Sequence, residues 1–251
     1  MNRRRYGSKR PNGGTARRRI GWTLGLLAAA VLAYLWLAGY LNDDARTRFA
    51  ATGTPSPLGA IYVSGDAGLR FGMGPVTSRA LAEHGIPVLG FNTPTLFRLH
   101  RTAAETNAIV ADMVREGLHD TGRDRLVVIG QSYGADLLAA ALPALPSDLR
   151  AHVAAVILVV PGRDIFFRAD PSGLAYRGTP DADGRAALRK LTWTPLTCIH
   201  GQAETDSACP GLHAPNATVI AMPGGHFLHR DSDGLVGHVL AAVAHANRKP
   251  T

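Results

Sequence analysis

The sequence predicts an α/β fold in which a mostly parallel sheet carries helices on both faces, preceded by one N-terminal transmembrane helix. After residue 57, short and almost purely apolar runs alternate with amphipathic stretches. Strands that are apolar on both faces are typical of parallel sheets that are covered on both sides. With 251 residues, 46% of them hydrophobic, the chain is long enough to bury such a core.

The expected strands and helices alternate along residues 58–248. We expect strands at 60–63, 87–91, 126–129, 153–160, 195–200 and 219–222, and helices at 75–84, 102–118, 135–142 and 235–246. The polar segment 163–190 interrupts this alternation, and we expect it to form an insertion over the carboxyl edge of the sheet. Residues 42–57 are polar and small, and are predicted to be a linker.

The net charge of +8 is concentrated at the N-terminus. Residues 1–19 hold 8 of the 27 basic residues and no acidic one, so the other 19 basic residues face 19 acidic ones. The folded part is therefore formally neutral, and we expect no nucleic-acid partner.

Residues 20–41 form a stretch of 22 residues without a charge. As a helix this stretch is roughly 33 Å long, enough to cross a hydrocarbon core of about 30 Å. The basic tail 1–19 predicts a cytoplasmic N-terminus, which places the following domain outside the cytoplasm. A cleaved signal peptide, with a site near Phe49-Ala50-Ala51, and a twin-arginine signal at Arg17-Arg18-Arg19 remain alternatives.

One pentapeptide, Gly130-Gln131-Ser132-Tyr133-Gly134, matches the pattern Gly-x-Ser-x-Gly. An apolar strand is expected before it and an apolar helix after it, which is the setting of a nucleophile elbow in an α/β-hydrolase. The fold class is therefore predicted to be α/β-hydrolase-like, with Ser132 as the nucleophile. An ordinary strand-to-helix loop with a capping serine is the alternative.

The partners that such a serine needs follow it in the order acid, then histidine. Asp206 follows the fifth expected strand and His226 follows the sixth. We expect His226 to be the general base, and Asp206 to orient it and stabilise the imidazolium. Glu204 is the alternative acid and His229 the alternative base. The other histidines lack ligand spacing, so we expect no metal and no cofactor.

An oxyanion in such a site needs two backbone N–H donors. We expect one from Tyr133 and the other from the loop after the first expected strand, at Asp66 or Ala67. Gln131, Asp66 and Asp136 lie beside these loops and are expected to contact the substrate. For the two aspartates, fixing their own loops is the alternative.

The two cysteines, Cys198 and Cys209, are 11 residues apart. Outside the cytoplasm such a pair favours one disulfide. The bridge would close the loop that carries Asp206. Two unrelated buried thiols are the alternative.

Four motifs resemble those of the AcvB/VirJ family of bacterial virulence proteins: Ser64–Gly68, Gly130–Asp136, Asp206–Pro210 and Pro223–His226. Arg101-Thr102, which opens the second expected helix, also fits, and the resemblance spans roughly residues 58–248. The chain departs from the family at Ala67 and Leu69, where glycine and tryptophan are usual, and at Phe227, where a second histidine is common.

The resemblance implies a periplasmic α/β-hydrolase with Ser132, Asp206 and His226 as the triad. It implies hydrolysis of the aminoacyl ester of lysyl-phosphatidylglycerol, a membrane phospholipid. The N-terminal helix is not part of the shared domain; from its residues we expect it to hold the domain at the inner membrane as a single-pass anchor. Asp66 and Asp136 are then the candidate contacts for the lysyl group. A general carboxylesterase or thioesterase is one alternative, and a non-catalytic binding or assembly factor on the same fold is another.

Overall fold

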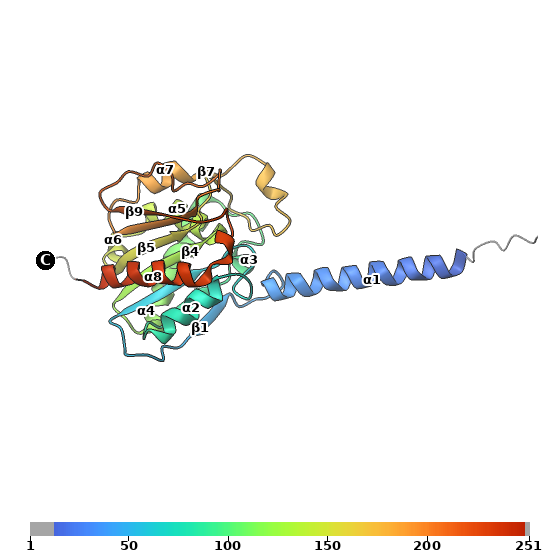
Figure 1. The fold of residues 1–251 in the computed structure, drawn as a ribbon, viewed down its shortest axis with the longest axis horizontal. Coiled ribbons are helices and arrows are strands. Elements are labelled where there is room, and N and C mark those ends of the chain that lie inside the picture. Colours follow the sequence, from blue (N-terminus) through green and yellow to red (C-terminus); the bar gives the residue numbers. More distant parts are fainter. Residues whose placement is uncertain (1–12, 249–251) are drawn as a thin grey trace, which may run out of the picture.

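The structure is a computed structural model that describes residues 13–248, and it confirms the predicted α/β fold (Figure 1). A seven-stranded sheet has the order β1-β3-β2-β4-β5-β8-β9. All of its neighbouring strands are parallel except β1, which is antiparallel to β3. The strands are β1 (Arg46–Phe49), β2 (Leu58–Val63), β3 (Val88–Phe91), β4 (Arg125–Gln131), β5 (Val153–Val159), β8 (Leu196–Gly201) and β9 (Ala217–Met222).

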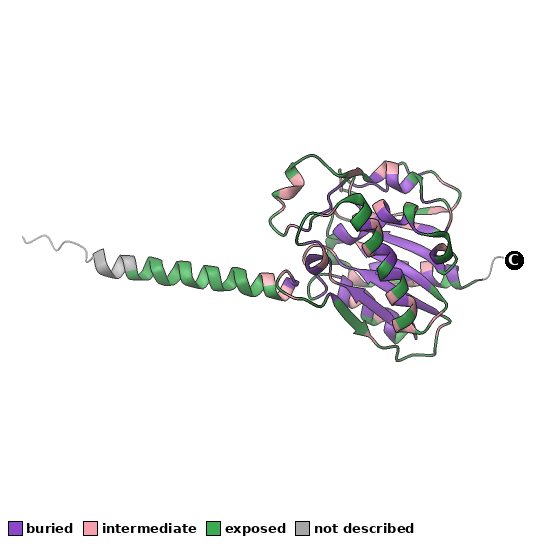
Figure 2. Ribbon diagram, turned by 180° about the vertical axis from the view of Figure 1, so that it is seen from behind, coloured by how far each residue is buried: buried purple, intermediate pink, exposed green. Residues whose placement is uncertain are grey.

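Helices cover both faces of the sheet, as predicted (Figures 1 and 2). On one face α2 (Gly74–Glu83) and α8 (Ser232–Asn247) pack on one apolar cluster; on the other α4 (Ala103–Thr121), α5 (Tyr133–Ala141) and α7 (Gly184–Arg189) pack on a second. The central strands β2, β3 and β5 are fully buried, because apolar side chains project from both sides of the sheet. The shorter elements are α3 (Thr93–Leu96), η1 (Leu142–Ala144), α6 (Ser147–Arg150), β6 (Asp164–Ile165), η2 (Ala175–Arg177), β7 (Ala182–Asp183) and η3 (Leu228–Arg230).

A long helix, α1 (Gly13–Ala38), projects from the domain and is exposed along most of its length (Figure 2). Its segment Arg18–Ala38 has the length and apolar composition of a helix that crosses a membrane, and also of a signal sequence. Residues 1–12 of the predicted basic tail lie outside the described residues.

The prediction that residues 42–57 form a linker is wrong for the middle of this segment. Residues Arg46–Phe49 form β1, which pairs with β3 from Arg46↔Phe91 to Phe49↔Val88, and Ala45 just before it is buried. The strand is short and its arginines are exposed, as is common at sheet edges that avoid further pairing. Four such residues carry too weak an apolar pattern to be recognised as a strand.

Candidate active site

Ser132 occupies a sharp turn between β4 and α5. Its backbone has φ 53° and ψ −125°, a conformation that non-glycine residues rarely adopt. A Cβ at Gly130 would lie 2.7 Å from the Gly134 carbonyl oxygen, and one at Gly134 would lie 2.2 Å from the Val63 carbonyl oxygen. The two glycines are therefore required for α5 to approach the sheet this closely. This is the geometry of a nucleophile elbow.

Two successive hydrogen bonds link Ser132 to His226 and His226 to Glu204. The distance between Ser132 Oγ and His226 Nε2 is 2.8 Å, and that between His226 Nδ1 and Glu204 Oε1 is 2.6 Å. An ionised carboxylate only accepts hydrogen bonds, so Nδ1–H is the donor to Glu204 and Nε2 is free to accept from the serine hydroxyl. The expected contact between Asp206 and His226 is therefore wrong, and the alternative acid, Glu204, takes this place.

The path of the backbone explains why Glu204, and not Asp206, contacts His226. The loop after β8 runs alongside the loop after β9, with Ala203 N–H donating to Gly224 C=O at 2.9 Å. Glu204 thus leaves the sheet directly beside His226, and its side chain is only 2% exposed. By Asp206 the chain has turned toward the insertion, where Arg163 N–H donates to the Asp206 carbonyl at 2.7 Å and the Asp206 residue is exposed.

The contact with Glu204 changes the proton affinity of His226. The hydrogen bond to the carboxylate raises the pKa of His226 above its usual value, and this effect outweighs the lowering caused by burial. Asp206 contributes a smaller raising effect through its charge. His226 therefore binds a proton more readily than a free imidazole does.

The Ser64–Gly68 loop lies against the serine. A Cβ at Gly65 would lie 3.3 Å from the Ser132 Cβ, so the loop backbone lies close beside the Ser132 side chain. Thr93 of α3 fixes the loop, because its Oγ1 donates to Gly65 C=O at 2.9 Å and its N–H donates to Ser64 Oγ at 3.1 Å. Within residues 13–248, the amide N–H groups of Ala67 and Tyr133 donate no hydrogen bond to another backbone group, whereas the Asp66 N–H donates to its own carboxylate.

A cleft of about 1010 Å³ opens over Ser132. All the predicted catalytic, oxyanion and substrate-contact residues line it: Ser132, Asp206, His226, Tyr133, Asp66, Ala67, Asp136 and Gln131. Phe166, Tyr176 and residues 170–173 of the insertion also line it, so the insertion lies over the carboxyl edge as expected. The alternative base His229 is not among the lining residues.

The charges in the cleft are mostly negative. Its charged lining side chains other than His226 are Asp66, Asp136, Asp164, Asp170, Glu204, Asp206 and Arg230, six carboxylates against one arginine. Such an excess of one sign attracts ligands of the opposite sign. The cleft therefore suits a cationic ligand.

Two of these carboxyl groups are held in low-polarity surroundings. Burial raises the pKa of Asp136 to about 7, although its Oδ1 accepts from Gly162 N–H at 2.6 Å. Burial also raises the pKa of Asp66, whose Oδ2 accepts from the Tyr176 hydroxyl at 3.3 Å. A carboxylate that is costly to ionise is stabilised by a bound cation. Gln131, by contrast, is held by the Tyr62 hydroxyl, which donates to its Oε1 at 2.7 Å.

The predicted disulfide between Cys198 and Cys209 is confirmed. Both cysteines are fully buried, and the bridge joins β8 to the far end of the loop that carries Glu204. Among residues 13–248, no group of three or more His, Cys, Asp or Glu side chains has the arrangement of a metal site.

Comparison with known families assigns the domain. The model of the bacterial virulence protein family VirJ matches residues 58–247, the whole of the folded domain after β1. The chain belongs to the VirJ family. No curated protein matches it in sequence.

Solved structures show the fold that this VirJ protein shares with other proteins. Est1E from Butyrivibrio proteoclasticus has a TM-score of 0.57 and 14% identity, over 79% of this chain and 94% of that chain. An alpha-beta serine hydrolase homologue from Coxiella burnetii has a TM-score of 0.58 and 16% identity, over 78% and 89%. XC6422 from Xanthomonas campestris, described as a serine hydrolase without a lid, has a TM-score of 0.52 and 21% identity, over 80% and 88%. These likenesses show that the VirJ chain has the α/β-hydrolase fold.

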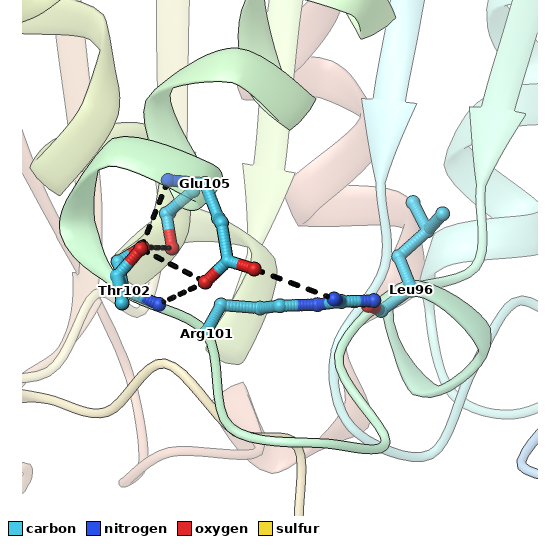
Figure 3. Close-up of polar contacts among 5 residues, drawn as sticks. Leu96, Arg101, Thr102 and Glu105 are labelled. Carbon is cyan, nitrogen blue, oxygen red and sulfur yellow. Dashed lines mark hydrogen bonds and ion pairs between the residues drawn. The ribbon is translucent and has the colours of Figure 1, made fainter.

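Arg101 and Thr102 directly precede α4 (Figure 3), and neither of them lines the cleft. Thr102 and Glu105 form a capping box, in which Glu105 N–H donates to Thr102 Oγ1 at 3.2 Å and Thr102 N–H donates to Glu105 Oε2 at 2.7 Å. Arg101 donates to the Leu96 carbonyl oxygen at 3.2 Å and lies 3.8 Å from the Glu105 carboxylate. This pair therefore ties α4 to α3, the element that carries Thr93.

Proposed function

We propose that this VirJ protein is a serine hydrolase that cleaves a carboxylic ester through an acyl-enzyme. The observation that carries the proposal is the hydrogen-bonded line from Ser132 through His226 to Glu204, with the serine in a strained elbow. A hydroxyl is a weak nucleophile unless a neighbouring base removes its proton, and His226 lies within hydrogen-bond distance.

The reaction has two halves. His226 Nε2 takes the proton of Ser132 as Oγ attacks the ester carbonyl, and then gives it to the departing alcohol, which leaves the acyl group on Oγ. A water molecule, activated by the same imidazole, releases the acyl group as a carboxylic acid and restores the serine. Glu204 keeps Nδ1 protonated and stabilises the imidazolium formed in each half.

The oxyanion of each tetrahedral intermediate is bound by backbone N–H groups. We assign one to Tyr133, at the start of α5, and the other to Asp66 or Ala67 in the Ser64–Gly68 loop. The Tyr133 N–H directly follows Ser132, and the Ala67 N–H lies in the loop whose Gly65 is beside Ser132. Neither donates to another backbone group within the described residues, which supports this assignment.

The acidic cleft favours an ester whose acyl group is cationic. A lysyl group carries two ammonium groups in an aminoacyl ester, and the raised pKa values of Asp66 and Asp136 indicate sites that gain from such a partner. Together with membership of the VirJ family, this supports the aminoacyl ester of lysyl-phosphatidylglycerol as the substrate.

The place of α1 supports a lipid substrate. The end of this helix meets the domain at the rim of the cleft, where the Tyr40 hydroxyl donates to the Asp66 carbonyl oxygen at 3.0 Å. A helix that spans the inner membrane would hold the cleft at the bilayer surface. The basic tail and the disulfide both favour a periplasmic location for the domain.

Turnover by the full-length protein in phospholipid vesicles tests the substrate. We expect faster hydrolysis of lysyl-phosphatidylglycerol than of alanyl-phosphatidylglycerol, whose acyl group has one ammonium group, and faster hydrolysis of either than of a neutral short-chain ester. Ser132→Ala is the control and should abolish all three activities. Equal rates for the lysyl and alanyl lipids would contradict recognition of the cationic side chain, and preference for the neutral ester would favour a general carboxylesterase.

A further inference from the structure

The end of α1 is built into the catalytic domain. Ala38, its last residue, is fully buried, and Tyr40 is half-buried against the apolar cluster that contains α4 and α5. The Tyr40 hydroxyl donates to the carbonyl oxygen of Asp66, in the middle of the Ser64–Gly68 loop. The proposed membrane anchor and the proposed oxyanion loop are therefore directly hydrogen-bonded.

Asn92, just after β3, joins the same two segments. Its Nδ2 donates to the Ala38 carbonyl oxygen at 2.9 Å, while its Oδ1 accepts from Leu69 N–H at 3.2 Å. Nearby, Thr95 Oγ1 donates to the Gly39 carbonyl oxygen at 2.8 Å. The last carbonyl groups of a helix need partners outside it, and here the catalytic domain supplies them.

The contact leaves no space between the two backbones. A Cβ at Gly68 would lie 2.3 Å from the Ala38 carbonyl oxygen, and one at Gly39 would lie 1.6 Å from Asn92 Nδ2. Gly39 also has φ +100°, the left-handed conformation that ends many helices. The helix end and the loop therefore hold each other in one relative position.

The Tyr40 contact acts on the peptide group between Asp66 and Ala67, in the loop whose Gly65 lies beside Ser132. In a trans peptide the C=O of Asp66 and the N–H of Ala67 lie in one plane and point in opposite directions. Fixing the carbonyl with the Tyr40 hydroxyl therefore fixes the direction of the Ala67 N–H, one of the two candidate oxyanion donors.

We propose that the membrane-proximal end of α1, through Tyr40 and Asn92, is a positioning element of the active site. This inference depends on the proposed function, because it assigns a catalytic consequence to the loop. It follows that the N-terminal segment is retained in the working enzyme. Processing near Phe49-Ala50-Ala51 would remove Tyr40 and also β1, and would leave the edge of β3 unpaired.

The test compares Tyr40→Phe with Tyr34→Phe in the full-length protein in detergent micelles. Tyr40→Phe keeps the ring and removes only the hydroxyl that bonds Asp66. Tyr34 is on α1, six residues before Tyr40, and the centroid of its ring lies 5.9 Å from that of Phe71, but its hydroxyl has no hydrogen-bond partner within the described residues. It is therefore the matched control for loss of a tyrosine hydroxyl.

We expect Tyr40→Phe to lower kcat on a soluble short-chain ester roughly threefold to tenfold, the factor that one hydrogen bond commonly contributes. KM should stay near the wild-type value, and Tyr34→Phe should behave as wild type. Amide hydrogen exchange at Gly68, whose N–H donates to the Gly65 carbonyl oxygen at 3.0 Å, should be faster in Tyr40→Phe alone. Assays run well below the lowest melting temperature of the three proteins, so that all are fully folded.

The positioning role would be overturned if Tyr40→Phe had the kcat and the amide hydrogen exchange of the wild type. It would also be overturned if Tyr40→Phe and Tyr34→Phe lost activity equally. A wild-type protein that hydrolyses no ester would instead overturn the proposed function. In that case the exchange measurement still decides whether Tyr40 orders the loop.

Discussion

Replacing Glu204 by Gln keeps the size of the side chain and removes its charge from His226. In the wild type, Nδ1–H of His226 donates to the Glu204 carboxylate at 2.6 Å, and the Glu204 side chain is 2% exposed, so little solvent is available to replace the lost charge. In a serine protease triad, the corresponding change of acid to amide lowers kcat about 10⁴-fold, because the imidazole takes the wrong tautomer. We expect a loss of that order here.

Asp206→Asn is the matched control, since it makes the same chemical change two residues away. The Asp206 residue is exposed and its charge is a minor influence on His226, so we expect kcat to fall less than about fivefold, as for a screened surface charge. Both variants are assayed by hydrolysis of a soluble ester and by melting temperature. A severe loss in Asp206→Asn with near-normal activity in Glu204→Gln would refute the assignment of the acid.

The pH profile gives a second test of the same contact. Only neutral His226 can accept the serine proton, so activity rises with pH through its pKa, and the hydrogen bond to Glu204 raises that pKa. In the pH profile of kcat/KM, the midpoint of the acidic limb of the wild type should therefore lie above the pH at which a free imidazole titrates. Residual activity of Glu204→Gln should show this limb at lower pH, and an unchanged limb would count against the Glu204–His226 pair.

Further predictions concern the cleft carboxyl groups and the disulfide. Since burial raises the pKa of Asp136 from 3.8 to about 7, the folded state holds a proton that the unfolded state has released between these values, and stability falls as pH rises through this window. The full difference amounts to roughly 4 kcal/mol at 1.36 kcal/mol per pH unit. Urea unfolding at a series of pH values should show a flatter dependence in Asp136→Asn, and an unchanged slope would exclude Asp136 as its source. In the same variant, KM for lysyl-phosphatidylglycerol should rise more than KM for a neutral ester, and equal changes would contradict a role in cation recognition. The Cys198→Ser/Cys209→Ser double variant should lose just under about 3 kcal/mol of stability by loop entropy. It should also hydrolyse a soluble ester more slowly at temperatures where it is fully folded, because the loop carrying Glu204 is no longer closed; full activity would show that the bridge only stabilises the fold.

The sequence predicts most of the sheet because its central parallel strands are apolar on both faces. It does not predict β1, whose four residues include two exposed arginines and whose pairing with β3 is a long-range contact. It also gives no indication that α1 ends against the Ser64–Gly68 loop, since Tyr40 and Asn92 are 52 positions apart and each is unremarkable by itself.

Ser132 and His226 could be placed in the candidate site from the sequence because each follows an apolar strand at the carboxyl edge. The acid could be narrowed only to Glu204 or Asp206, two residues apart on one loop. What decides between them is the pairing of this loop with the loop after β9, which brings Glu204 beside His226 while the chain turns away before Asp206. Local sequence does not specify that pairing.

Reaction with a fluorophosphonate probe tests most directly whether Ser132 is an activated nucleophile. The serine Oγ attacks phosphorus and displaces fluoride, which leaves a stable adduct that mass spectrometry can assign to a residue. We predict stoichiometric labelling of the folded wild-type protein at Ser132, much slower labelling of Glu204→Gln, and none of Ser132→Ala. A folded wild-type protein that stays unlabelled, or one that is labelled at another serine, would contradict the account and favour a non-catalytic binding protein or a different site.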